Sequence, residues 1–185
     1  FAAVALVVML MLTSMSAVTL AETTPIVTDE KVDSVVQFAA AELSSFLDRL
    51  YPDSDFPVQK KWPEKGNVIA IGVAGSENKI ADLIGDAELK GKDSFLVRAV
   101  EESGRSVGVI AGANPRGALY GVYELLEELG CGFYISYNAV PSKAEGSFDF
   151  EAWDFMDYPL TPERFVFDWH NFLSSCSTWN VEDWR

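Results

Sequence analysis

Histidine, cysteine and basic side chains are all scarce in this sequence, and each shortage excludes a class of function. The single histidine cannot supply the repeated ligand spacing of a histidine-based metal site. Two cysteines, Cys131 and Cys176, are too few for a disulfide framework, and Cys131 is expected to be a small buried residue. With 14 Lys and Arg against 28 Asp and Glu, the net charge of −14 argues against nucleic acid and anionic membrane surfaces as partners.

The glycine-rich stretches also lack the pattern of a nucleotide site. Residues 72–75 and 112–117 do not have the G-x-G-x-x-G spacing of a dinucleotide-binding turn. Ordinary turns account for both sets of glycines, and the sequence therefore predicts no cofactor.

What is present is enough apolar sequence for one ordinary domain with a hydrophobic core, since 49% of the 185 residues are hydrophobic. The chain starts at Phe1 rather than Met, and it stops shortly after Asn180, a good helix N-cap followed by acidic residues. We therefore expect a fragment that is open at both ends.

The first 21 residues are typical of a targeting segment. Residues 1–12 are uncharged and almost wholly apolar, and residues 13–21 are smaller and more polar, with a cleavage site at Thr19-Leu20-Ala21. The sequence thus predicts a signal peptide and a secreted or periplasmic protein. The alternative is an uncleaved membrane anchor, for which the apolar run is short.

The rest of the chain alternates strand and helix patterns in the order β-α-β-α-β-β-α-β. Such an order predicts an α/β fold, and the hairpin within it makes the β-sheet mixed, with helices packed on it. The predicted helices are residues 32–50, 76–83 and 115–129, and the predicted strands are residues 25–27, 67–73, 94–101, 106–112 and 132–136, with an edge strand at 56–59.

The third helix has the clearest signals of beginning and end. Asn114 is a good N-cap, Pro115 suits the first helical position, and Gly130 supplies a left-handed residue at the end. The helix starts with RGALYG and ends with LLEELG, and an aromatic strand then leads to Val140-Pro141.

This combination resembles the N-terminal domain of family 67 glycoside hydrolases, the α-glucuronidases, and is similar to the non-catalytic domain 2 of β-N-acetylhexosaminidases. The residues that carry the resemblance are Arg116, Gly117, Tyr120, Gly121, Leu125 to Glu127, Leu129, Gly130, Phe133, Tyr134, Val140 and Pro141. It implies a hexosaminidase domain 2-like, non-catalytic α/β domain at residues 22–150, a connector at 151–163 and the start of a truncated TIM barrel, the (β/α)8 catalytic barrel, at 164–185.

If residues 165–168 form the first barrel strand, then Trp169, His170 and Asn171 lie at its C-terminal end, where barrels bind substrates. Trp169 could stack on a sugar face, while His170 and Asn171 could hydrogen-bond hydroxyl or carboxylate groups. Arg164 could meet an anionic or hydroxyl group. These four are the candidate substrate-binding residues, against the simpler interpretation that His170 and Trp169 only pack. Arg116 is expected to form a structural salt bridge.

The resemblance implies a secreted glycoside hydrolase that breaks down polysaccharide, with an α-glucuronidase-like activity and a carbohydrate substrate. In these families the catalytic carboxylates come from later barrel strands, so the chain by itself is expected to be inactive and its catalytic residues stay unknown. Two alternatives remain open: a secreted non-catalytic carbohydrate-binding or structural module, and a periplasmic small-molecule binding domain.

Overall fold

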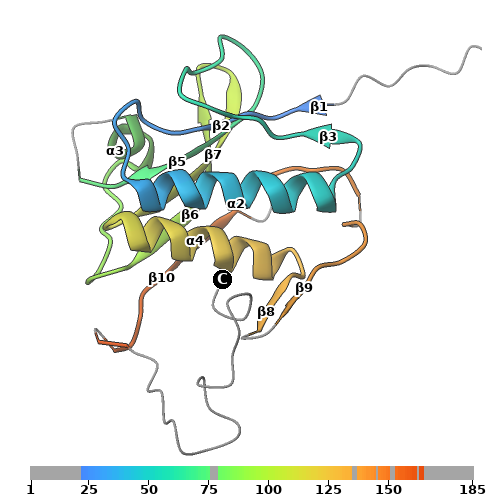
Figure 1. Ribbon diagram of the computed structural model, residues 1–185. Coiled ribbons are helices and arrows are strands. Elements are labelled where there is room, and N and C mark those ends of the chain that lie inside the picture. The colour runs from blue at the N-terminus through green and yellow to red at the C-terminus, as the bar shows by residue number, and fades with distance from the viewer. Residues whose placement is uncertain are drawn as a thin grey trace, which may run out of the picture.

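A six-stranded mixed sheet forms the centre of the computed structural model, which describes residues 22–75, 79–134, 137–144, 146–150, 153–161 and 163–164. The strand order is β10-β6-β7-β5-β2-β4. Two long helices cover one face of the sheet and a short helix packs on the other (Figure 1). The predicted mixed sheet with helices packed on it is confirmed, whereas residues 165–185, most of the predicted barrel start, lie outside the described residues.

Parallel pairing organises one half of the sheet. The strand β5 (Val68–Val73) lies between β2 (Ile26–Val27) and β7 (Arg105–Gly112), both parallel to it. Five of its six residues are buried, as expected for a continuous apolar run covered on both faces. The predicted edge strand is present as the shorter β4 (Val58–Gln59), which pairs with β2. Phe56, the first residue of the predicted strand, lies outside β4, and its side chain is fully buried in the core.

The predicted hairpin joins β6 (Phe95–Glu102) to β7 in the other half of the sheet. Its turn residues Ser103 and Gly104 both have positive φ, of 55° and 77°, as the two-residue turns favoured in hairpins require.

The strand β10 (Asp154–Asp157) pairs antiparallel with β6 at the edge of the sheet, within the range predicted as a connector. Just before it, Trp153 and Phe150 are buried over Gly108, where the missing side chain leaves room for their rings. Trp153 is thus part of the core, whereas Tyr158, just after β10, is half exposed.

Helices α2 (Ser34–Leu50) and α4 (Pro115–Glu128) pack side by side on one face of the sheet (Figure 1). α2 begins two residues later than predicted, because the side chain of Asp33 accepts a hydrogen bond from the Val35 amide and caps it. α4 ends as predicted before Gly130, whose φ is 89°.

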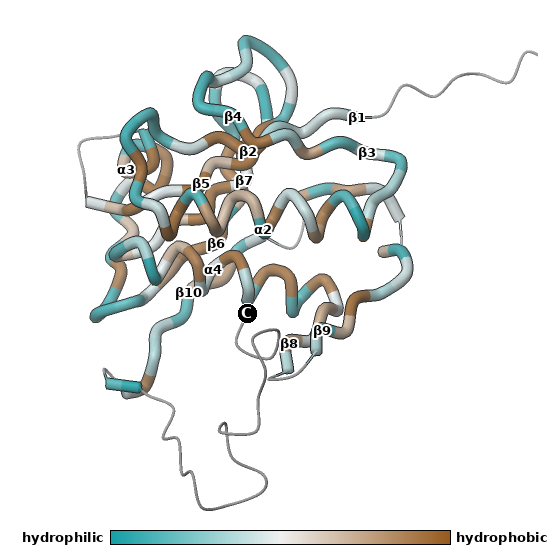
Figure 2. Tube along the Cα trace, viewed as in Figure 1, coloured by the Kyte–Doolittle hydropathy of each residue, from teal (hydrophilic) through white to brown (hydrophobic). Residues whose placement is uncertain are grey.

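The opposite face carries the short helix α3 (Lys79–Ile84). The helix was predicted over residues 76–83, and its first three residues, 76–78, lie outside the described residues. Ile80 packs directly on Gly72, where a Cβ atom would lie 2.8 Å from the isoleucine side chain. Hydrophobic residues accordingly concentrate along the central strands and the facing sides of the helices (Figure 2).

Two small sheets lie beside the central one. β1 (Glu22–Thr23) pairs parallel with β3 (Ser54–Asp55), and β8 (Gly132–Tyr134) pairs antiparallel with β9 (Tyr137–Ala139). The predicted aromatic strand is therefore present in its first three residues, but as part of a separate hairpin.

Candidate functional site

Of the four residues predicted from the sequence to bind substrate, only Arg164 is among the described residues; Trp169, His170 and Asn171 lie outside them. The Nη2 atom of Arg164 donates to Asp93 Oδ2 at 2.8 Å and to the Tyr120 hydroxyl at 3.2 Å, and its Nη1 atom donates to the Thr161 carbonyl at 2.7 Å. Its guanidinium also lies 5.3 Å from the centroid of the Tyr120 ring. Arg164 therefore has an anionic and a hydroxyl partner within the protein, and its contact with a substrate stays a prediction.

Asp93 is the centre of this arrangement, because its side chain is only 1% exposed and three other side chains converge on it. Oδ1 accepts a hydrogen bond from Asn114 Nδ2 at 2.8 Å, while Oδ2 faces Arg164 and, at 3.5 Å, Nη1 of Arg116. We call Asp93, Asn114, Arg116, Tyr120 and Arg164 the Asp93 cluster. The predicted structural salt bridge of Arg116 is confirmed, with Asp93 as its partner.

The cluster keeps Asp93 ionised. Burial alone would raise the pKa of the Asp93 carboxyl, since it removes water from the charged form. Hydrogen bonds from Asn114 and Arg164, together with the charges of Arg116 and Arg164, outweigh burial and hold the pKa of Asp93 below its usual value. A buried carboxylate satisfied in this way stabilises the fold and is not available as a general acid at neutral pH.

The backbone around Asp93 is shaped to admit the helix start. Asp93 has a φ of 64°, a left-handed conformation that Asp tolerates better than most residues. Asn114 caps α4 by accepting the amide of Gly117 at 2.9 Å. A Cβ atom at Gly117 would collide with the carbonyl oxygen of Ser94, so only glycine allows this approach. The RGALYG sequence is thus accounted for by packing and by the Asp93 cluster.

A hollow of about 300 Å³ opens beside the Asp93 cluster, between α4 and the segment that follows β10. Burial, and then the charges of Glu127, Asp157 and Glu128, raise the pKa of Glu124 in it. Among the described residues that line it, Arg164 alone is basic; they are Phe95, Tyr120, Tyr123, Glu124, Glu127, Asp157, Tyr158, Pro159 and Arg164. We call this the acidic hollow; a carboxyl with a raised pKa, such as that of Glu124, is a candidate for acid–base chemistry.

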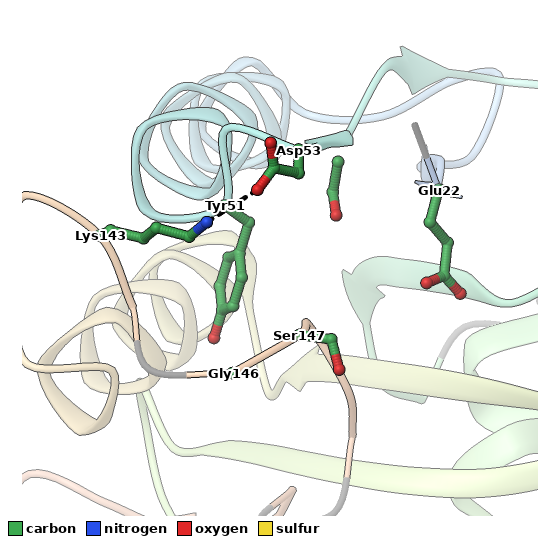
Figure 3. A pocket seen from close by; sticks show the side chains of 7 residues that line it. Glu22, Tyr51, Asp53, Lys143, Gly146 and Ser147 are labelled. Carbon is green, nitrogen blue, oxygen red and sulfur yellow. Dashed lines mark hydrogen bonds and ion pairs between the residues drawn. The ribbon is translucent and has the colours of Figure 1, made fainter. Parts of the chain in front are cut away.

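A second hollow, of about 330 Å³, lies between the end of α2 and the chain after β9 (Figure 3). Lys143 reaches across it to Asp53, with Nζ 2.7 Å from Oδ2, while Glu22 lies on the far side. Both partners of this ion pair are more than half exposed, so it contributes little to stability. Burial and the charge of Asp149 raise the pKa of Tyr51, whose hydroxyl points into this hollow.

A third hollow, of about 390 Å³, lies beside the carboxyl ends of β5 and β7, the edge at which α/β sheets commonly bind ligands. None of its described lining residues has a polar side chain: they are Ala74, Gly75, Ala81, Ile84, Gly85, Ala87, Leu89 and Ala113. Gly112, at the end of β7, lies against the backbone of Asn114 and Ala118, so its role is close packing and not the ordinary turn that the sequence predicted.

Within the described residues, no group of three or more His, Cys, Asp or Glu side chains is placed to hold a metal ion. Nor does any helix described here combine the length and apolarity needed to cross a membrane. Cys131 is buried at the end of α4, as predicted, and burial raises the pKa of its thiol.

Asp93 could not be identified from the sequence, because it lies in a polar turn with no periodic pattern around it. Its partner Arg164 is 71 residues away along the chain, so only the folded arrangement brings the two together. Asn114 and Arg116 were the residues of the cluster that the sequence did single out, because both lie at the start of a predicted helix.

Comparison with known proteins identifies a family whose sequences this chain matches. The family described as "Glycosyl hydrolase family 67 N-terminus" matches residues 13–125. A search among curated proteins found no match to the chain.

Among solved structures, a similar one is that of BtGH115A, described as a family GH115 4-O-methyl-α-glucuronidase with specificity for decorated arabinogalactans. It has a TM-score of 0.55 at 20% identity over 74% of this chain and 17% of BtGH115A, so the likeness is one of fold, and the chain spans about a sixth of that protein. A second is CpGH84D, with a TM-score of 0.41 at 20% identity over 56% of this chain and 17% of that one.

Proposed function

Because the chain belongs to the family of glycosyl hydrolase family 67 N-termini, we propose that it is the N-terminal part of a carbohydrate-degrading glycoside hydrolase with an α-glucuronidase-like activity. The chain supplies the α/β domain of that enzyme, and residues 1–21 direct its export to the periplasm or the medium. The substrate is a carbohydrate, bound in part by Trp169, His170 and Asn171. The catalytic carboxylates come from parts of the complete protein that follow this chain.

The observation that carries this proposal is the family match over residues 13–125, and the part that we propose for the domain comes from the Asp93 cluster. It ties the start of α4 to Arg164, the residue at which the catalytic barrel is proposed to begin. A domain that fixes the chain at this point sets where the first barrel strand starts, and so where the substrate-binding residues after it lie. In this proposal Arg164 is a positioning residue.

The acidic hollow is the alternative location for catalysis, since a glycosidase needs two carboxylates at a defined separation. The raised pKa of Glu124 would suit a general acid. Burial, together with the like charges of Glu127 and Glu128 on α4 and Asp157 on β10, is however enough to explain the raised pKa of Glu124. We therefore assign Glu124 and Glu127 no part in hydrolysis.

The test uses the complete protein from which this chain derives, with release of glucuronic acid from glucuronoxylan oligosaccharides as the readout. We expect the uronic acid to be released, and Glu124→Gln and Glu127→Gln to keep kcat within about twofold, since neither touches the reacting sugar. A fall of about a hundredfold or more in either variant would move the catalytic acid into this domain. Absence of any glycosidase activity in the complete protein would remove the enzymatic proposal.

A further inference from the structure

The β8–β9 hairpin has two faces of opposite character. In its register Tyr134 lies opposite Tyr137 and Phe133 lies opposite Asn138. Residues paired across two strands share a face, and neighbours along a strand alternate between faces. One face therefore carries the two tyrosines beside the small residues Gly132 and Ala139, and the other carries Phe133.

The Phe133 face fastens the hairpin to the helices. The ring of Phe133 meets Phe46 of α2 edge-on at a centroid distance of 5.3 Å and Tyr123 of α4 at 4.7 Å. Tyr123 is itself held by a hydrogen bond of 2.9 Å from its hydroxyl to Glu42. The hairpin thus extends from the C-terminal end of α4 on a fixed aromatic base (Figure 1).

The opposite face presents two tyrosine rings to solvent. The rings of Tyr134 and Tyr137 stack with their centroids 4.9 Å apart and their planes at 26°. They remain 56% and 62% exposed, among the most exposed large side chains of the described residues. Tyr134 also lies across Gly132, where a Cβ atom would be 2.8 Å from its ring. Stacking and this close approach hold the rings in place before any ligand arrives, which lowers the entropy cost of binding.

The chemistry of this face favours an uncharged, hydroxyl-rich ligand. Residues 132–139 contain no charged side chain, although the whole chain carries a net charge of −14. Residues 132–139 thus supply no cation to hold an anionic ligand, and the negative net charge of the chain repels one. Each ring has one face against the other, and the parts of the rings that stay exposed can contact the C–H groups of a sugar ring while the phenol hydroxyls bond its hydroxyls.

We propose that the face formed by Tyr134 and Tyr137 is an auxiliary binding site for neutral sugar rings of a polysaccharide. The inference rests on the proposed function, because it makes this polysaccharide the substrate of the complete enzyme. The site would hold the polymer on the N-terminal domain. Its contribution is to affinity for the polymer and not to the chemical step.

The experiment is native affinity electrophoresis of the full 185-residue chain in gels that contain soluble xylan, arabinogalactan or, as the anionic comparison, polygalacturonate. At least one neutral polymer should retard the chain, and polygalacturonate should not. Tyr137→Ala should weaken the retardation about tenfold, as expected for the loss of one central aromatic contact. Tyr137→Phe keeps the ring and should retain most of it, and Tyr158→Ala, another half-exposed tyrosine, should leave it unchanged.

The inference is overturned if neither neutral polymer retards the chain, or if Tyr158→Ala weakens the retardation as much as Tyr137→Ala does. It is also overturned if sedimentation equilibrium shows a dimer that depends on Tyr137, because the face would then bind a second copy of the chain. Circular dichroism of each variant excludes loss of fold as the cause.

The assay is independent of hydrolysis. If binding occurs while the complete protein hydrolyses nothing, the site stands and the enzymatic proposal fails; if hydrolysis occurs without binding, only the site fails.

Discussion

The two ends of α4 use polar and aromatic residues in opposite ways. At its N-terminal end, the Asp93 cluster buries a charged carboxylate and satisfies it with an amide and two guanidinium groups. At its C-terminal end, the β8–β9 hairpin leaves two stacked tyrosines in solvent, and residues 132–139 themselves carry no charge. The polar groups at the first end bind one another within the protein, whereas the aromatic side chains at the second end remain exposed to solvent.

The difference shows which residues of a recognisable motif bear on function. RGALYG is the most recognisable part of the chain, yet Arg116, Gly117 and Tyr120 all have partners inside the protein. The less distinctive aromatic strand after it carries the exposed surface. Substitutions at the first end should therefore alter stability, and those at the hairpin should alter binding with little change in stability.

The largest effect is expected where the backbone itself is in contact. Gly117→Ala would place a Cβ atom against the Ser94 carbonyl oxygen, and the start of α4 would have to move away from β6. We expect a loss of about 3 kcal/mol in the free energy of unfolding, measured in urea. Gly121→Ala is the matched control, because its nearest contact is the side chain of Ile110 at 3.0 Å, which can shift. Equal losses in both variants would contradict the close approach at Gly117.

A smaller loss should follow from removing the charge at the centre of the cluster. Asp93→Asn keeps the shape of the side chain and tolerates the left-handed φ, but it leaves Arg116 and Arg164 without an anionic partner. We expect about 2 kcal/mol less stability in urea unfolding. If the variant is as stable as the parent, the cluster does not hold α4 in place.

Asp93 in the cluster and Glu124 in the acidic hollow should change the stability of the fold in opposite directions as pH falls. The pKa of Asp93 is lowered in the folded state, so its stabilisation is present above the unfolded value of about 3.9 and is lost as pH falls through the folded value. The pKa of Glu124 is raised, so its ionisation opposes folding above about pH 4.3, and that penalty is relieved as pH falls.

Asp93→Asn should accordingly flatten the loss of stability below about pH 4, whereas Glu124→Gln should raise stability at pH 7 and change it little at pH 3. Urea unfolding of both variants at pH 3, 5 and 7 measures this. The opposite order, with Glu124→Gln destabilising at neutral pH, would show that Glu124 has a favourable partner.

The main sheet could be predicted from the sequence because its determinants are local. Caps at Asn114 and Gly130, the Ser103-Gly104 turn and the apolar run of β5 each specify structure within a few residues. β10 could not be found in this way, because its four residues owe their strand to pairing with β6, more than 50 residues earlier. Asp93 was missed for the same reason: its role depends on contacts made across 21 to 71 residues.

The smallest effect should come from the outer edge of the cluster. Tyr120→Phe removes the hydroxyl that accepts from Arg164 at 3.2 Å but keeps the ring beneath the guanidinium. Since Arg164 retains Asp93 and the Thr161 carbonyl, we expect a loss of about 0.5 kcal/mol in urea unfolding. Tyr158→Phe, at an exposed tyrosine of the same hollow, is the control and should change nothing measurable. A loss from Tyr120→Phe as large as that from Asp93→Asn would mean that the hydroxyl, and not the carboxylate, sets the position of Arg164.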